Sequence, residues 1–198
     1  MKNIAIIGAG GMGRELRLQM LDNDPSLKIE FFVEDSFVCE ISKPIGMLVP
    51  ENYIVFIAVG EPEIKKRLVS LLPPETEYGV FVHKSAKIFG DDVSFGEGTI
   101  VCANCVLTTN ISVGKHAIFN RGVQVGHDCV IGDFFSAMPG SIVSGNCMIG
   151  DLVYLGTNSS IRERIVVVSE TTIGLCTGVV KNISDPGVYG GVPAVRIK

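Results

Sequence analysis

The sequence has no cluster of lysine and arginine residues, and its 198 residues carry a formal net charge of −4. Because a nucleic-acid groove is built on such a basic cluster, nucleic acid is not expected as a partner. No uninterrupted apolar run reaches the roughly eighteen residues of a membrane span, so no membrane span is expected. The N-terminus "MKNIAIIGAGGMG" turns to glycine too soon for a signal peptide, which makes a cytoplasmic location the expectation.

Six cysteines are present, but their spacing predicts neither a disulfide framework nor a zinc site. Cys102 and Cys105 form a single CxxC motif without a second pair. Cys105, Cys129 and Cys147 occupy a repeated position at which small residues recur, where a thiol packs as a compact hydrophobe. The last two are eighteen residues apart and can stack, and a cytosolic setting keeps such thiols reduced.

What the sequence contains instead is a six-residue repeat over its C-terminal part. Sixteen residues spaced six apart, from Phe89 to Val179, are all apolar; in a chain that is 46% apolar, chance produces such a run with a probability of roughly four in a million. The fifth position of each hexad is mostly small or β-branched. The position after the apolar residue is often glycine, as in Gly90, Gly96, Gly114, Gly126, Gly132, Gly150, Gly156 and Gly174.

This repeat predicts a parallel β-helix with three flat faces. The apolar residue and the small residue are expected to point inward, and the glycine is expected to form the tight turn between faces. Three hexads make one coil, so residues eighteen apart stack at about the 4.8 Å strand spacing. The seventeen hexads from His83 to Ser184 give between five and six coils without an insertion. The pattern resembles that of hexapeptide-repeat acyltransferases, so an all-β left-handed parallel β-helix with a C-terminal tail is expected over 81–198.

The first 80 residues have a different pattern, in which strands alternate with helices. "KNIAIIGAGGMGREL" predicts an apolar strand, a G-x-G-x-x-G turn that begins at Gly8, and a helix. "LKIEFFVED" predicts a second strand that ends in acidic residues about twenty positions after the glycines. "YIVFIAVG" predicts a third strand, which a helix over "EPEIKKRLVSLL" follows, and "PPETE" marks the boundary. The prediction for 1–80 is an α/β half-Rossmann domain.

The glycine motif leaves alternatives open. A tight turn between strand and helix can have these residues without binding a ligand, and an NAD-dependent dehydrogenase begins in the same way. A dinucleotide, however, needs two mononucleotide halves, and about eighty residues supply only one. One half can hold a single nucleotide diphosphate, with the backbone N–H groups and the helix N-terminus facing the phosphates. A UDP-sugar is the expected ligand.

The two parts together resemble bacterial sugar acetyltransferases of the PglD and NeuD type. The resemblance covers essentially the whole chain and rests on "GAGGMG", "ED" after the second strand, "FIAVGEPEIKKRL", "VHKSA", "NRGVQVGHDCVIGDF" and "VYGGVPA". It implies an acetyl-CoA-dependent N-acetyltransferase that acts on the amino group of a nucleotide-linked sugar, with a UDP-4-amino-dideoxy sugar favoured, for bacterial surface glycans or glycoproteins. An O-acetyltransferase that acts on sialic acid or a related sugar is the second interpretation. A non-catalytic β-helix scaffold is the third.

The resemblance assigns the catalytic roles to His127 and Asp128. In such enzymes the histidine of this motif is the general base, and the acidic residue after it raises its basicity. An imidazole, with an unperturbed pKa near 6.5, suits the removal of a proton from a sugar amine that attacks an activated thioester. The alternative for His127 is a solvated turn residue at a corner of the β-helix.

The other two histidines, His83 and His116, are not expected to act with His127. A zinc site like that of the γ-carbonic anhydrases, which also use left-handed β-helices, needs three convergent histidines. In the hexad phase the three histidines of this chain fall on three different faces. No metal cofactor is therefore predicted.

The resemblance also places acetyl-CoA along the coils stacked above His127. Gly145, eighteen residues further on, is expected to offer its backbone N–H to the thioester carbonyl as an oxyanion donor. Thr157 and Leu175 match positions that line the pantetheine arm. Ser136 stands where many relatives carry a second histidine, and a serine can still donate one hydrogen bond there.

For the sugar nucleotide, the resemblance implies contacts from both parts of the chain. Many relatives have aspartate in place of Glu34, so a base other than uracil is also open. A CoA-sized ligand needs a cleft, whereas one prism has only shallow corners. A homotrimer with sites shared between neighbours is therefore expected, as in the superfamily. The expected contacts are Gly10, Gly11 and Met12 toward the pyrophosphate, Glu34 and Asp35 toward the uracil or ribose, Gly60 beside the sugar nucleotide and Asn120 near the reacting amine.

Overall fold

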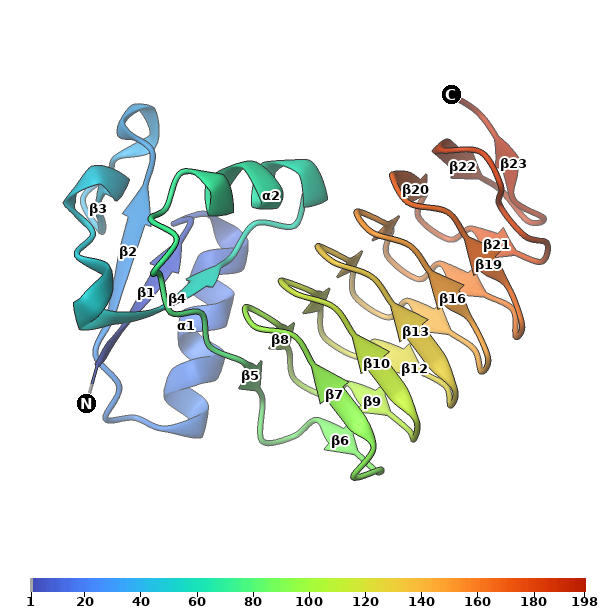
Figure 1. Cartoon of the computed structure of the whole chain (residues 1–198), viewed down its shortest axis with the longest axis horizontal. Helices are drawn as coiled ribbons and strands as arrows, with labels where there is room; N and C mark the ends of the chain where they lie inside the picture. The colour runs from blue at the N-terminus through green and yellow to red at the C-terminus, as the bar shows by residue number, and fades with distance from the viewer. Residues whose placement is uncertain (1) are drawn as a thin grey trace.

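The computed structural model describes residues 2–198 (Figure 1). They form a small parallel β-sheet with two helices, followed by a long stack of β-coils. The N-terminal sheet is parallel throughout, with the strand order β3-β2-β1-β4. The sequence pattern predicts β1, β2 and β4, but it does not predict β3, because the segment Ser-Lys-Pro has no aliphatic or aromatic side chain. The strands are β1 (Asn3–Ile7), β2 (Ile29–Val33), β3 (Ser42–Pro44) and β4 (Tyr53–Ile57).

Two helices cover opposite faces of this sheet. Alternate residues of a strand point to opposite faces, so Ile4 and Ile6 share a core with helix α1, while Ala5 and Ile7 share a core with helix α2. No helix among residues 2–198 is both long and apolar enough to cross a bilayer. The helices are α1 (Gly11–Asn23) and α2 (Pro62–Ser70), and between them lie the 3-10 turns η1 (Asp35–Phe37), η2 (Ile45–Met47) and η3 (Pro50–Asn52).

From Phe81 onward the chain winds into a parallel β-helix with three faces. From Val93 to Val179, each strand pairs with the strand eighteen residues later, as in Ile118↔Ser136, so the predicted parallel β-helix with coils of three hexads is confirmed. The two strands before Val93 pair at a spacing of nineteen, with Val82 opposite Val101 and Ile88 opposite Leu107, so the first coil contains one extra residue and the expectation of no insertion is wrong. Face 1 contains β5 (Phe81–Val82), β8 (Ile100–Val101), β11 (Ile118–Phe119), β14 (Ser136–Ala137), β17 (Tyr154–Leu155) and β20 (Thr171–Ile173). Face 2 contains β6 (Lys87–Ile88), β9 (Val106–Leu107), β12 (Gln124–Val125), β15 (Ile142–Val143), β18 (Ser160–Ile161) and β21 (Gly178–Val179). Face 3 contains β7 (Val93–Phe95), β10 (Ile111–Val113), β13 (Cys129–Ile131), β16 (Met148–Ile149) and β19 (Val166–Val167).

The interior of the β-helix is filled by the two predicted positions of each hexad. Their side chains form one continuous core that runs from Val101 to Ile183. Cys129 and Cys147 stack within it, and all six cysteines of the chain are free thiols. Phe89 departs from the pattern and is 71% exposed. The reason is the one-residue shift of the first coil, in which Ile88 instead of Phe89 lies opposite Leu107 and packs against the core.

The turns between faces use left-handed backbone two residues after the hexad glycine. His116 and Asp128 occupy two of these turns, with φ of 55° and 58°. The prediction that the hexad glycines form these turns is therefore wrong, and their small size serves a different purpose. A Cβ at Gly126 would lie 2.6 Å from the backbone nitrogen of Gly145 in the next coil. The hexad glycines thus let successive coils approach closely.

The eighteen-residue spacing ends near the C-terminus. The strand β22 (Gly187–Gly190) pairs with β20 at a shorter spacing, with Thr172 opposite Val188. The strand β23 (Val195–Arg196) then turns back and pairs antiparallel with β22. This hairpin extends face 1 and covers the edge that the last regular strand of that face would otherwise expose.

The N-terminal sheet and α1 pack on the outside of face 1. Leu16 of α1 and Ile6 of β1 share one apolar core with Ile100 and Ile118, whose side chains are 0% exposed although they belong to the outer surface of the β-helix. This packing fixes the N-terminal sheet beside the first coils, as Figure 1 shows. Among residues 2–198, no comparable sheet or helix packs on the outside of face 2 or face 3.

Candidate active site

His127 and Asp128 lie at the corner between faces 2 and 3, which we call the His127 corner. Nδ1 of His127 is 2.6 Å from Oδ2 of Asp128. Because an ionised carboxylate only accepts hydrogen bonds, this contact assigns the proton to Nδ1 and leaves the lone pair on Nε2. Nε2 has no hydrogen-bond partner among residues 2–198, and 56% of the side chain is exposed. The imidazole therefore has the tautomer and the access that a general base needs.

Asp128 is held by the coil that precedes it. Its backbone N–H donates to the carbonyl of Thr109 at 3.1 Å, and its Oδ1 accepts from Nδ2 of Asn110 at 2.6 Å. The bond from Asn110, followed by the bond from His127, lowers the pKa of Asp128 below its usual value. The carboxylate is consequently ionised at neutral pH. Sequence reasoning missed Asn110, although it precedes Asp128 by the eighteen residues that stack one coil on the next.

The next coil supplies a flat platform for the imidazole at Gly145. A Cβ built at this position would lie 2.7 Å from Nε2 and 2.8 Å from Cε1 of His127, so the ring rests directly on the glycine. The Gly145 N–H has no acceptor among the residues that the structure describes. The structure thus brings Gly145 together with His127 and Asp128, and it leaves a backbone donor beside the free imidazole nitrogen.

Replacing Gly145 with alanine is expected to lower kcat by about tenfold or more, because the added methyl group must push the imidazole away from its position. Steady-state acetyl transfer, measured as release of free CoA thiol, checks this expectation. Gly46→Ala is the matched control, since a Cβ there meets nothing within 4 Å. Equal kcat values for the two variants would mean that the position of the ring on Gly145 has no importance for the reaction.

The predicted acetyl-CoA residues do not all lie near His127 within one chain. Thr157 and Leu175 are exposed at the corner between faces 1 and 2, which we call the Asn120 corner because Asn120 directly follows β11 there. Face 2 separates this corner from the His127 corner. Ser136 lies on face 1 and is 0% exposed, so a ligand at the surface cannot contact its hydroxyl in this arrangement.

Ser136 is covered by a lysine that sequence reasoning missed. Lys65 of α2 is fully buried, and its Nζ donates to the carbonyls of His116 and Phe135 at 2.7 and 2.9 Å and to the Ser136 hydroxyl at 2.9 Å. Burial lowers the pKa of Lys65 well below its usual value. No sequence signal identifies this residue, because "EIKKRL" is typical of an exposed helix surface.

The three histidines lie in the turns at three different corners of the β-helix, and not on three faces as predicted, but they are separated from one another as the hexad phase requires. His116 is 3% exposed, and burial lowers its pKa to about 4. Its ring stacks on Phe134 with the centroids 5.2 Å apart. His83 is also buried, with Nδ1 2.8 Å from the Ser85 hydroxyl. Among residues 2–198, no group of three or more His, Cys, Asp or Glu side chains could hold a metal ion.

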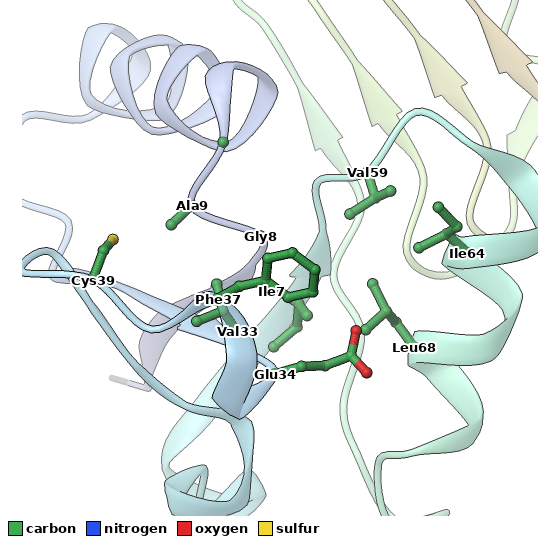
Figure 2. A pocket seen from close by; sticks show the side chains of 11 residues that line it. Ile7, Gly8, Ala9, Val33, Glu34, Phe37, Cys39, Val59, Ile64 and Leu68 are labelled. Carbon is green, nitrogen blue, oxygen red and sulfur yellow. The ribbon is translucent and has the colours of Figure 1, made fainter.

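A cavity of about 410 Å³ opens at the carboxyl ends of the N-terminal strands (Figure 2). Its walls are mostly apolar, with Phe37 and Ile7 at the centre of the view and Ile64 and Leu68 contributed by α2. Glu34 supplies a carboxylate, which Arg67 holds by two hydrogen bonds of 2.7 Å each. The Arg67 guanidinium lowers the pKa of Glu34, so this carboxylate is ionised at neutral pH and its charge is paired with that of Arg67.

The structure groups some of the predicted nucleotide contacts around this cavity and separates others from it. Gly10 borders the cavity and caps α1, and a Cβ at Gly10 or Gly11 would meet nothing within 4 Å, so the space before the helix is open. Met12 is half-buried and packs against the apolar core. Asp35 is exposed and is not part of the cavity wall. Gly60 lies at the Asn120 corner, where a Cβ would be 3.5 Å from Met138.

Comparison with known proteins connects this arrangement to sugar acyltransferases. No protein-family model matches the chain. It is 25% identical over 173 residues to GDP-perosamine N-acetyltransferase of Escherichia coli O157:H7, covering 81% of this chain and 78% of that protein. It is 36% identical over 110 residues to a probable mitochondrial UDP-3-O-acylglucosamine N-acyltransferase of Arabidopsis thaliana, covering 48% of this chain. The matched region spans only 36% of the length of the Arabidopsis protein.

Among solved structures, the chain resembles the acetyltransferase domain of PglB from Neisseria gonorrhoeae FA1090, with a TM-score of 0.88, 25% identity and complete coverage of both chains. The likeness therefore includes the N-terminal sheet as well as the β-helix. The resemblance to hexapeptide-repeat sugar acetyltransferases, predicted from the sequence motifs, is confirmed.

Proposed function

We propose that this protein transfers an acetyl group from acetyl-CoA to the amino group of a nucleotide-linked sugar. The observation that carries the proposal is the His127 corner, where Asp128 fixes the proton on Nδ1 and leaves Nε2 free above Gly145. Two of the similar proteins point to the same chemistry. The name of the E. coli protein states N-acetylation of GDP-perosamine, and the PglB domain has also been solved in complex with acetyl coenzyme A.

In the proposed reaction, the sugar amine attacks the carbonyl carbon of the thioester while Nε2 of His127 accepts one of its protons. The Gly145 N–H donates to the oxyanion that forms, which is the role of an oxyanion hole. The C–S bond then breaks, and the imidazolium returns the proton to the departing CoA thiolate. Asp128 stabilises the imidazolium between the two proton transfers. Because acetyl-CoA is already activated, no metal ion is required.

We assign the nucleotide to the N-terminal part, as a half-Rossmann domain over residues 1–80. The open space before α1 leaves the N–H groups of Gly11 and Met12 available to a pyrophosphate. The apolar cavity beside it has the size and character of a site for a base or ribose, with Glu34 as its acidic group. The β-helix over 81–198 then carries the acetyl transfer. Acetyl-CoA as co-substrate also favours the cytoplasm as the location.

We further propose that the active form is a homotrimer with shared sites. The predicted acetyl-CoA and amine contacts are divided between the Asn120 corner and the His127 corner, with face 2 between them. A second chain whose Asn120 corner lies against this His127 corner would form a cleft from both. Face 3 also has an exposed apolar stripe beside the His127 corner, formed by Val130, Met148 and Val166, which are 51%, 58% and 40% exposed. A neighbouring subunit would cover this stripe.

Mixing two inactive variants tests the shared site. Gly11→Trp fills the open space before α1 and blocks the nucleotide, while His127→Ala removes the base. If each site combines the nucleotide domain of one subunit with His127 of the next, co-expression restores activity to about a quarter of wild type in a random trimer. If one subunit supplies both parts, every subunit in the mixture carries a lesion and activity stays at background.

An acceptor panel tests the reaction itself. Release of free CoA thiol is measured with acetyl-CoA and 4-amino sugars linked to UDP or GDP, and in parallel with free and activated sialic acids. Turnover with an amino sugar is the expected result. Turnover with sialic acids alone would replace the proposal with O-acetylation. Failure to bind acetyl-CoA and to acetylate any acceptor would favour a scaffold.

A further inference from the structure

Asn110 stands directly beneath the proposed catalytic pair and makes a hydrogen bond to it. Its Nδ2 donates to Oδ1 of Asp128 at 2.6 Å, while Oδ2 of the same carboxylate is 2.6 Å from Nδ1 of His127. The two oxygens of one carboxylate therefore have different partners, one in the preceding coil and one at the reaction centre.

Building on the proposed function, we propose that Asn110 is a positioning residue for acetyl transfer, which acts by orienting the Asp128 carboxylate toward His127. An exposed carboxylate that has only one partner can rotate about its last bond and solvate both oxygens in water. A donor on Oδ1 from a fixed backbone opposes this rotation and keeps Oδ2 on Nδ1. The imidazole then keeps the tautomer in which Nε2 carries the lone pair.

The backbone beneath Asn110 is itself well anchored, which qualifies it to orient another side chain. Asn110 has φ of 51°, a left-handed conformation that asparagine adopts more readily than most residues. The Thr109 hydroxyl donates to both oxygens of Asp92 in the coil below, at 3.0 and 2.9 Å. The Thr109 carbonyl accepts the backbone N–H of Asp128 in the coil above. Residues 109 and 110 thus connect three successive coils at this corner.

Position 146 provides a matched control. Asn146 occupies the same corner one coil beyond Asp128, with φ of 59°, and its side chain has no hydrogen-bond partner among residues 2–198. Alanine at 110 and alanine at 146 therefore bear the same backbone strain. Only the substitution at 110 removes a bond to Asp128. Asn110→Gly is a further variant, which removes the same bond without strain because glycine accepts left-handed backbone.

We expect Asn110→Ala and Asn110→Gly to lower kcat by about fivefold to tenfold while KM for acetyl-CoA changes less than about twofold. Asn146→Ala should stay within about twofold of wild type in both constants. Thermal unfolding midpoints of Asn110→Ala and Asn146→Ala should agree with each other. Equal kcat values for Asn110→Ala and Asn146→Ala would overturn the proposal.

A double-mutant cycle separates positioning from a general structural role. If Asn110 acts only through Asp128, then Asn110→Ala should have no further effect on kcat in a chain that already carries Asp128→Ala. Full additivity of the two losses would overturn the proposal, because it would mean that Asn110 acts by another route.

Nitrogen-15 NMR of histidine-labelled protein gives a readout that needs no turnover. With only three histidines in the chain, the His127 ring signals can be assigned from the spectrum of the His127→Ala variant. Asn110→Ala should shift the ring toward a mixture of tautomers, and Asn146→Ala should not. An unchanged ring in Asn110→Ala overturns the inference even if the wild type proves inactive. Absence of acetyl transfer in the wild type, by contrast, counts against the proposed function.

Discussion

Replacing His127 with alanine is expected to lower kcat by about 10²-fold or more, because general-base assistance is typically worth 10²- to 10⁴-fold. The protein should still fold, since the side chain is 56% exposed at a corner and contributes little to the core. Acetyl-CoA should still bind, because the platform at Gly145 and the Asn120 corner are unaltered. Steady-state thiol release and isothermal titration with CoA measure the two effects separately.

Added imidazole is the sharpest control for this variant. The exposed corner leaves space for a free imidazole molecule, which should restore part of the lost activity as its concentration and its neutral fraction increase. The unfolding midpoint of His127→Ala should match that of wild type. Near-normal turnover of the variant would remove His127 as the base and leave it as a solvated turn residue.

The second large effect is expected at Lys65, which joins α2 to the β-helix. Lys65→Ala removes three hydrogen bonds and leaves the His116 carbonyl without its donor. Loss of one partner from a buried polar group costs about 1 to 3 kcal/mol, and the cavity left by the side-chain stem adds to this. We therefore expect the free energy of unfolding to fall by about 3 kcal/mol, as measured by urea denaturation at fixed protein concentration.

Lys66→Ala is the matched control, since the neighbouring lysine on the same helix is exposed. Its free energy of unfolding should stay within about 0.5 kcal/mol of wild type. Equal stability of the two variants would show that the buried contacts of Lys65 contribute no net stability. In that case the cost of burying the amine would equal the gain from its hydrogen bonds.

The stability difference between wild type and Lys65→Ala should also depend on pH. Burial lowers the pKa of Lys65 in the folded state below 10.5, its usual value. Between the two pKa values the unfolded chain binds more protons at this residue, so the free energy of unfolding of the wild type rises with pH. The difference between the two proteins should therefore grow as pH rises toward 10.5, and a constant difference over that window would contradict the lowered pKa.

The prediction from sequence was most successful where the structure is periodic. The hexad pattern predicted the β-helix, the eighteen-residue stacking from Val93 to Val179 and the separation of the three histidines. It also placed Gly145 one coil above His127, and the same arithmetic identifies Asn110 one coil below Asp128. It did not predict the extra residue of the first coil. The role of the hexad glycines was predicted wrongly, because the pattern alone cannot distinguish a left-handed turn from a close approach of two coils.

From Val93 to Val179 the sequence by itself determined which residues stack on one another, because the regular part of a parallel β-helix repeats its backbone register and stacked residues are eighteen apart in the chain. Only the tertiary structure decided which face the N-terminal sheet covers. That choice buried Lys65 and Ser136 together and placed Gly60 beside Met138 at the Asn120 corner. The physical reason is that packing between the N-terminal sheet and the β-helix depends on the shapes of the two folded surfaces that meet. Residues distant in sequence build those surfaces, and no periodicity relates them.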